Sequence, residues 1–320
     1  MVQFRRVIQF LFLVVGVLAG MITAMAFYMA RFLINPPRKR LWTTPSNNGM
    51  SYEEIQFPAR DGLRLSGWFI PAANRGSGIA AGSLIIVHGW PWNRLGTLAE
   101  NVMSDLPGSA PVNLLDLAHG LHQLNYDVLM FDLRNHGRSA RSIPVTFGMK
   151  ESNDLLGALD YLAGREDVDD DRIGVVGFSM GANTLLYSLP QTTLVKAAVA
   201  VQPTSPAVFS IRTTSQLVGP LARPVLFVTE LLYRLAGGIQ LSAIEPVFTA
   251  AGSGDTKVLY IQGTGDPWGS VENVADMVAK TPNAAEPIFI QTSGRFGGYH
   301  FVIERPDLID QFCQQQFESG

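Results

Sequence analysis

The sequence contains a single cysteine, Cys313, among its 320 residues. No disulfide can therefore form within the chain, and the fold must rest on its hydrophobic core. We expect Cys313 to be a small buried residue near the C-terminus. Its isolation leaves the cellular compartment open, because many exported proteins also lack disulfides.

Charged residues are also scarce, at 16% of the chain, and the formal net charge is −3. No basic stripe interleaved with aromatic residues is present, so the sequence lacks the usual features of a nucleic-acid-binding protein. Internal repeats and low-complexity tracts are absent as well, so a repeat architecture is excluded. The hydrophobic content of 47% favours a well-packed globular chain with an additional apolar portion.

That additional portion is an uncharged stretch at the N-terminus, from Val7 to Ala30. As a helix its 24 residues would be about 36 Å long, enough to cross a hydrocarbon core of roughly 30 Å. We therefore expect residues 1–34 to form a single-pass membrane anchor. The alternative is a cleavable signal peptide, because Ala24-Met25-Ala26 has the small-x-small form of a cleavage site, and the domain would then be secreted.

Basic residues flank this segment on both sides. Arg31 and residues 38–40 follow it, against Arg5 and Arg6 before it, which favours a cytoplasmic position for the C-terminal domain. A short basic N-terminus that stays inside would give the opposite orientation. Residues 35–50 contain Pro, Asn and Ser and are interpreted as a linker, and residues 51–320 as the globular domain.

Two patterns of hydrophobic residues alternate along the globular domain. After a hairpin signal around Arg60-Asp61-Gly62, short continuous apolar runs are typical of strands buried on both faces, and segments with helical spacing lie between them. This order predicts an α/β fold with a mostly parallel sheet flanked by helices. The insertion at 203–256 is expected to form a small helical cap. The expected strands are 52–57, 63–71, 83–89, 127–132, 172–179, 196–202, 257–263 and 287–291, and the expected helices are 113–124, 151–164, 182–189, 270–280 and 305–317.

Ligands of such sheets bind at the carboxyl ends of the strands, so the residues after each strand are the ones to examine. Ser179 follows one strand in a Gly-x-Ser-x-Gly turn that leads into a helix. Asp266 follows another, and His300 lies in a glycine-rich stretch after the last strand. We expect that stretch to be a loop that carries the imidazole back over the sheet edge.

These three residue types are what acyl transfer requires. A serine hydroxyl is a weak nucleophile until an imidazole takes its proton, and a carboxylate must hold that imidazole in the right tautomer. The chain order Ser179, Asp266, His300 is the order found in α/β-hydrolases. The sequence therefore predicts a Ser-His-Asp triad that acts through an acyl-enzyme.

The turn at residues 88–90 is expected to complete the site. The backbone N–H groups of Trp90 and Met180 would face the developing oxyanion, and one such donor is worth roughly 3–4 kcal/mol. His88, Gly89 and Phe178 are expected to bind the substrate beside them.

With these motifs the chain resembles the α/β-hydrolase superfamily from residue 52 to its end. The matching segments are His88-Gly89, "DLRNHGRS" (132–139), "RIGVVGFSMGA" (172–182), "GTGDPW" (263–268) and "GGYH" (297–300). The chain is most similar to bacterial esterases and to the catalytic domains of dienelactone hydrolase and prolyl oligopeptidase. The resemblance implies a serine hydrolase of carboxylic esters or thioesters that needs no cofactor and no metal.

Two other functions use the same features. A serine peptidase would accept small peptides, and a catalytically idle protein of this fold would only bind its ligand. The apolar segment 220–241 packs on the sheet in the simplest interpretation, or else faces a bilayer or an acyl chain, which suggests lipophilic esters.

Other polar residues offer alternatives that the sequence favours less. His136 is a competing base, although the family pattern makes it part of a structural loop. His119 and His122 have a helical spacing that can bind metal, but no third ligand is evident. The acidic run at 166–172 lacks the spacing of a calcium loop and is interpreted as a solvated turn held by Arg172.

Overall fold

The computed structural model describes residues 2–74, 80–101, 105–106 and 108–318. Its centre is an eight-stranded sheet in the order β1-β2-β6-β3-β7-β8-β9-β10. β1 pairs with β2 and β2 with β6 in the antiparallel sense, and all other pairs are parallel. The strands are β1 (Glu53–Pro58), β2 (Arg64–Ile70), β3 (Gly82–Val87), β6 (Tyr126–Asp132), β7 (Ile173–Phe178), β8 (Val195–Val201), β9 (Lys257–Gly263) and β10 (Ile288–Ile290).

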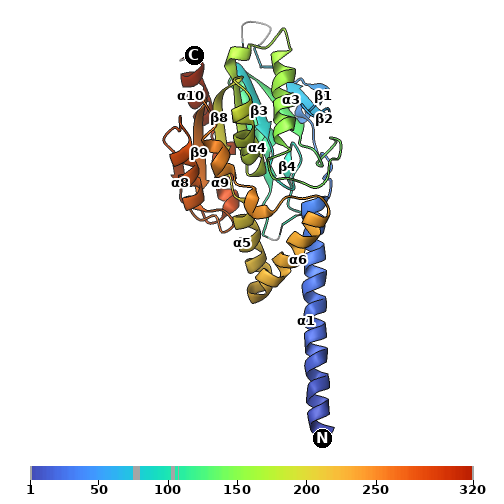
Figure 1. Ribbon diagram of the computed structural model, residues 1–320. Helices are drawn as coiled ribbons and strands as arrows, with labels where there is room; N and C mark the ends of the chain where they lie inside the picture. The colour runs from blue at the N-terminus through green and yellow to red at the C-terminus, as the bar shows by residue number, and fades with distance from the viewer. Residues whose placement is uncertain (1, 75–79, 102–104, 107, 319–320) are drawn as a thin grey trace.

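Helices cover both faces of this sheet (Figure 1). One hydrophobic cluster joins the sheet to α3, α4, α7 and α8, and a second joins its other face to α2, α9 and α10. The central strands β3, β6 and β7 are buried along their whole length, as their continuous apolar runs predict. The predicted mostly parallel sheet flanked by helices is therefore confirmed. These helices are α2 (Leu114–Gln123), α3 (Ser152–Ala163), α4 (Met180–Ser188), α7 (Pro246–Ala250), α8 (Val271–Lys280), α9 (Arg295–Ile303) and α10 (Pro306–Phe317), and a short pair β4 (Gly96–Thr97) and β5 (Val112–Asn113) lies apart from the sheet.

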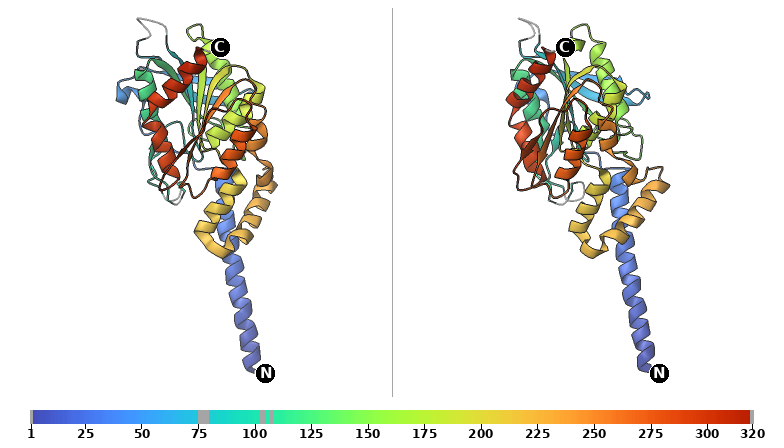
Figure 2. Two further views of the ribbon diagram at one scale, coloured as in Figure 1. Left: turned by 90° about the vertical axis from the view of Figure 1, so that its left-hand side faces the viewer. Right: turned by 60° about the vertical axis from the view of Figure 1, so that its left-hand side comes forward.

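A helical cap follows β8 and extends from the end of the sheet where the parallel strands finish. We use the word cap for α5 (Pro206–Val218) and α6 (Ala222–Leu235). Both helices project beyond the sheet, and α6 lies beside α1 (Figures 1 and 2). The apolar segment at 220–241 thus contains the whole of α6.

The N-terminal helix α1 (Val2–Ile34) leaves the globular part at this same end (Figure 2). It is long and apolar enough to cross a membrane, with a mean hydropathy of 2.5 and only 6% of its most apolar window buried. The C-terminal end of α1, by contrast, is packed against the rest of the protein. Ala26 is fully buried, its carbonyl accepts a hydrogen bond from Thr229 Oγ1 of α6 at 3.4 Å, and the Leu33 carbonyl accepts one from the Val145 amide. The division into anchor, linker and catalytic domain stays a prediction.

One element differs from expectation. The glycine-rich stretch after β10, expected as a loop, forms the helix α9 from Arg295 to Ile303. Its start is held by Gln202, whose Nε2 donates to the Arg295 carbonyl at 2.7 Å. Gly298 is required on the contacting face, because a Cβ there would lie 2.4 Å from Gln202 Oε1. This contact with β8 is long-range and cannot be seen in the local sequence.

Candidate active site

Ser179 stands at the tip of a tight turn between β7 and α4. Its backbone has φ 53° and ψ −112°, a conformation that costs a non-glycine residue of order 1–3 kcal/mol. The turn needs both flanking glycines. A Cβ on Gly177 would lie 2.5 Å from the Gly181 carbonyl oxygen, and one on Gly181 would lie 2.2 Å from that of Val87. The Gly-x-Ser-x-Gly motif is therefore a nucleophile elbow in structure as well as in sequence.

Asp266 lies just beyond the end of β9 and is buried, with 8% of its surface exposed. One carboxylate oxygen, Oδ1, accepts a hydrogen bond from the Trp268 amide at 2.9 Å. The other, Oδ2, accepts one from Arg295 Nη1 at 2.5 Å. The carboxylate thus points toward the site, as predicted for the acid, but its partner is a guanidinium.

Arg295 occupies the place between the acid and the nucleophile. Its Nη2 donates to Ser179 Oγ at 2.9 Å and to the Gln202 carbonyl at 3.0 Å, while Nη1 also donates to Thr204 Oγ1 at 3.2 Å. Burial is the largest single influence and lowers the pKa of this guanidinium, but the interactions with Asp266 and Tyr299 together outweigh burial and raise that pKa above its ordinary value. A guanidinium in this state has no lone pair for a proton, so Arg295 cannot act as a general base.

His300 does not contact Ser179 or Asp266, contrary to the predicted triad. Its Nε2 is bonded to the Pro111 carbonyl oxygen at 2.7 Å. The reason is helical geometry, since residues four apart share a face and residues five apart do not. Arg295 and Tyr299 therefore both face Ser179, and His300 is turned away by about 100° from Tyr299.

Two other histidines are buried below the turn at 88–90. His88 Nδ1 is bonded to the Gly89 carbonyl, and its Nε2 accepts a hydrogen bond from the Leu133 amide at 3.0 Å. Burial lowers the pKa of His88 to about 3, and burial also lowers that of His136, whose ring lies 5.2 Å away. Both imidazoles are neutral structural groups.

Ser179 lines two narrow cavities of about 20 and 10 Å³. Trp90 and Met180, the expected oxyanion donors, both line the larger of these. Each cavity has room for about one water molecule and none for an acyl group. His88, Gly89 and Phe178 were expected to bind substrate, but none of them lines either cavity. All three residues are buried, so they support the site by packing and do not form its surface.

The residues considered for metal binding stay apart from this site. His122 Nδ1 is bonded to the Pro71 carbonyl at 2.9 Å. The carboxylates of Asp169, Asp170 and Asp171 lie close together but are exposed, and Arg172 pairs with Asp169 at 3.6 Å. The predicted solvated turn held by Arg172 is confirmed.

The comparisons with known proteins agree with this geometry. A family model described as the alpha/beta hydrolase fold matches residues 82–220, which include the elbow. An esterase of Pyrococcus furiosus, Pf2001, superposes with a TM-score of 0.67 over 89% of this chain and 98% of its own, at 22% identity. Residues 82–220 thus match this family, and the chain has the α/β-hydrolase fold.

Two further proteins are similar over smaller parts of the chain. The protein YfhR of Salmonella typhi is 31% identical over 189 residues, which cover 58% of this chain and 55% of YfhR. The aligned part thus spans just over half of that relative. An acylaminoacyl peptidase of Pyrococcus horikoshii superposes with a TM-score of 0.57 over 84% of this chain and 42% of its own, at 16% identity. These structural likenesses show a shared fold.

Sequence reasoning missed Arg295 and Tyr299 of this site. Both line one of the cavities above Ser179, and burial raises the pKa of the Tyr299 phenol although Arg295 opposes the shift. One signal was available. Arg295 is the first charged residue after β10, directly behind a glycine, at the strand end where the site was expected.

Proposed function

We propose that the protein is a membrane-anchored serine hydrolase that cleaves carboxylic esters or thioesters of apolar acyl groups, with Ser179 as the nucleophile. The observation that carries this proposal is the strained backbone of Ser179 at the elbow, because such strain persists where it serves a function. The family and its esterase-like neighbours support a hydrolase with a small-molecule substrate.

The proposed reaction has two balanced steps. Ser179 Oγ attacks the acyl carbonyl, its proton passes through the base to the leaving alcohol or thiol, and an acyl-enzyme remains. Water then attacks this ester, gives up a proton to the same base, and releases the acid with Ser179 restored. The backbone N–H groups of Met180 and Trp90 would stabilise the oxyanion in both steps.

The base in this proposal is His300, after a rearrangement of α9. Of the five histidines, it is the one adjacent in sequence to a residue of the cavities over Ser179, namely Tyr299. Gly297 and Gly298 lie in the same helix and weaken it, since glycine in a helix costs about 1 kcal/mol relative to alanine. We propose that the Arg295–Asp266 pair holds the resting arrangement.

The membrane attachment rests on α1. Most of its apolar surface is exposed, which a helix of a soluble core would not tolerate, whereas its last two turns are packed against the cap. A cleavage after Ala26 would cut within this packed region. These observations favour an uncleaved anchor over a signal peptide.

A second function is favoured by one specific observation. Arg295 stands where the imidazole of a triad would stand, and it blocks proton transfer from Ser179. A protein that binds an acyl ligand without turning it over would have this geometry.

Labelling with a fluorophosphonate probe separates the two functions. The full-length protein in detergent is compared with Ser179→Ala, with His300→Gln, and with His119→Gln on α2 as the matched control. The proposed hydrolase predicts labelling of the wild type and of the control, no labelling without Ser179, and a loss of about 100-fold or more in rate without His300. If the wild type is not labelled, the binding function is the one that remains. If His300→Gln is labelled as fast as the wild type, His300 is not the base.

A further inference from the structure

We infer that α1 is part of the substrate-binding site as well as an anchor, because its C-terminal turns form one wall of a cavity that binds an acyl chain taken from the bilayer. This inference rests on the proposed function for the fate of the ligand. The binding step itself depends only on the cavity.

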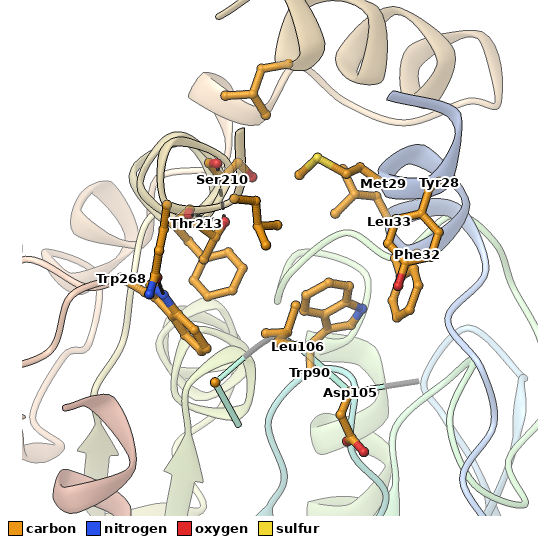
Figure 3. A pocket seen from close by; sticks show the side chains of 15 residues that line it. Tyr28, Met29, Phe32, Leu33, Trp90, Asp105, Leu106, Ser210, Thr213 and Trp268 are labelled. Atoms are coloured by element: carbon orange, nitrogen blue, oxygen red, sulfur yellow. Dashed lines mark hydrogen bonds between the residues drawn. The ribbon is translucent and has the colours of Figure 1, made fainter. Parts of the chain in front are cut away.

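The cavity has a volume of about 250 Å³ and lies between α1 and the cap. Its walls are mostly apolar side chains from elements far apart in the sequence (Figure 3). A mostly apolar cavity of this kind accepts apolar ligands. The side chains that matter here are Met29, Phe32 and Leu33 from α1, Phe209 and Leu217 from α5, and Leu226 from α6.

Three aromatic residues separate this cavity from Ser179. Trp90 and Phe209 line both the large cavity and the two narrow ones, and Trp268 lines the large one and one narrow one. The Phe209 ring centroid lies 6.1 Å from that of Trp90 and 5.8 Å from that of Trp268. A displacement of Phe209 alone would therefore join the spaces, and would place the head of a bound chain at Ser179.

The surface around the cavity indicates where the chain comes from. The cap exposes large apolar side chains, and it lies beside α1 at the end of the molecule from which α1 departs (Figure 2). Exposed apolar surface of this kind marks contact with a membrane. The exposed large apolar side chains of the cap are Ile211 at 37%, Leu217 at 42%, Phe227 at 73%, Leu231 at 48% and Leu235 at 76%.

Photolabelling of the full-length protein in lipid nanodiscs tests the inference. The probe is a palmitic acid with a diazirine near its tail, and labelled peptides are mapped by mass spectrometry. We expect labels on the last two turns of α1 and on α5. Met29→Trp and Leu226→Trp fill the cavity from two sides and should lower this labelling about tenfold, because the added indole occupies the space that the acyl chain would enter.

Two controls make the result specific. Val17→Trp places the same large side chain on the exposed surface of α1 and should label like the wild type. Ser179→Ala should also label like the wild type, because the cavity does not need the nucleophile. Melting temperatures show whether each variant is folded. If one of the two cavity variants does not fold, the other still tests the cavity.

The outcomes separate the two proposals. Labelling that is spread over α1 and is unchanged in folded Met29→Trp and Leu226→Trp would overturn the cavity, even if short esters are hydrolysed at Ser179. Cavity-dependent labelling of a protein that no fluorophosphonate modifies would uphold the cavity and overturn the proposed hydrolase.

Discussion

Arg295 donates a hydrogen bond to Ser179 Oγ at 2.9 Å and pairs with Asp266 through its other terminal nitrogen. The predicted acid and the predicted nucleophile are thus bridged by a group that cannot take a proton. The nucleophile elbow beside it is intact. The turn at Ser179 is complete, but the serine hydroxyl is bonded to a cation. The first two experiments therefore change Arg295 and Asp266.

Arg295→His should place an imidazole between Asp266 and Ser179. Because a positioned general base contributes about 10²–10⁴-fold, we expect fluorophosphonate to label this variant at least tenfold faster than Arg295→Gln. The rate should rise with pH through the ordinary range of a histidine, near 6.5. Equal rates for the two variants would show that residue 295 does not stand in the base position.

Asp266→Asn should destabilise the protein strongly. The Arg295 and Asp266 side chains are 3% and 1% exposed, and removing one partner of a buried ion pair costs about 3–5 kcal/mol. Chemical denaturation followed by tryptophan fluorescence measures this loss in the free energy of unfolding. The double variant Asp266→Asn/Arg295→Gln should recover part of it, because no buried charge is left unpaired, and a double variant as unstable as the single one would contradict this account.

Stability should fall as the pH drops from 6.5 toward 5. Burial lowers the pKa of His88 to about 3 in the folded state, while in the unfolded chain it stays near 6.5. The unfolded state therefore binds a proton first, and this one residue should remove up to about 1.4 kcal/mol per pH unit. Replacing His88 with Asn should make the pH dependence of the free energy of unfolding shallower by this amount. Parallel curves for the two proteins would contradict the assignment.

The N-terminal segment should remain attached to the mature protein. Ala26, at the end of the possible cleavage motif, is fully buried, and its carbonyl is bonded to Thr229 of the cap. Intact-mass spectrometry of the protein extracted from membranes should detect residues upstream of Ala24. A mature chain that begins at Phe27 and is recovered in the soluble fraction would identify the segment as a signal peptide.

Most of the sheet could be predicted because its signals are local. Continuous apolar runs such as that of β7 indicate strands covered on both faces, and the two glycines around Ser179 indicate a sharp turn. Asp266 could be placed because the end of a strand is visible in sequence. The helix α9 could not be placed in this way, because three glycines precede or interrupt it and its start is held by Gln202, 93 residues away.

The sequence by itself determined the α/β fold, the tight turn at Ser179, the place of Asp266 beyond the end of a strand and an N-terminal helix long enough to cross a membrane. Only the tertiary structure decided which side chain meets Ser179. Once residues 295–303 are helical, the helical period turns Arg295 and Tyr299 toward Ser179 and His300 away from it. The packing of α1 against the cap is likewise visible only in the tertiary structure. The apolar sequence of α1 predicts that the helix avoids water, but it does not predict which surface the helix contacts.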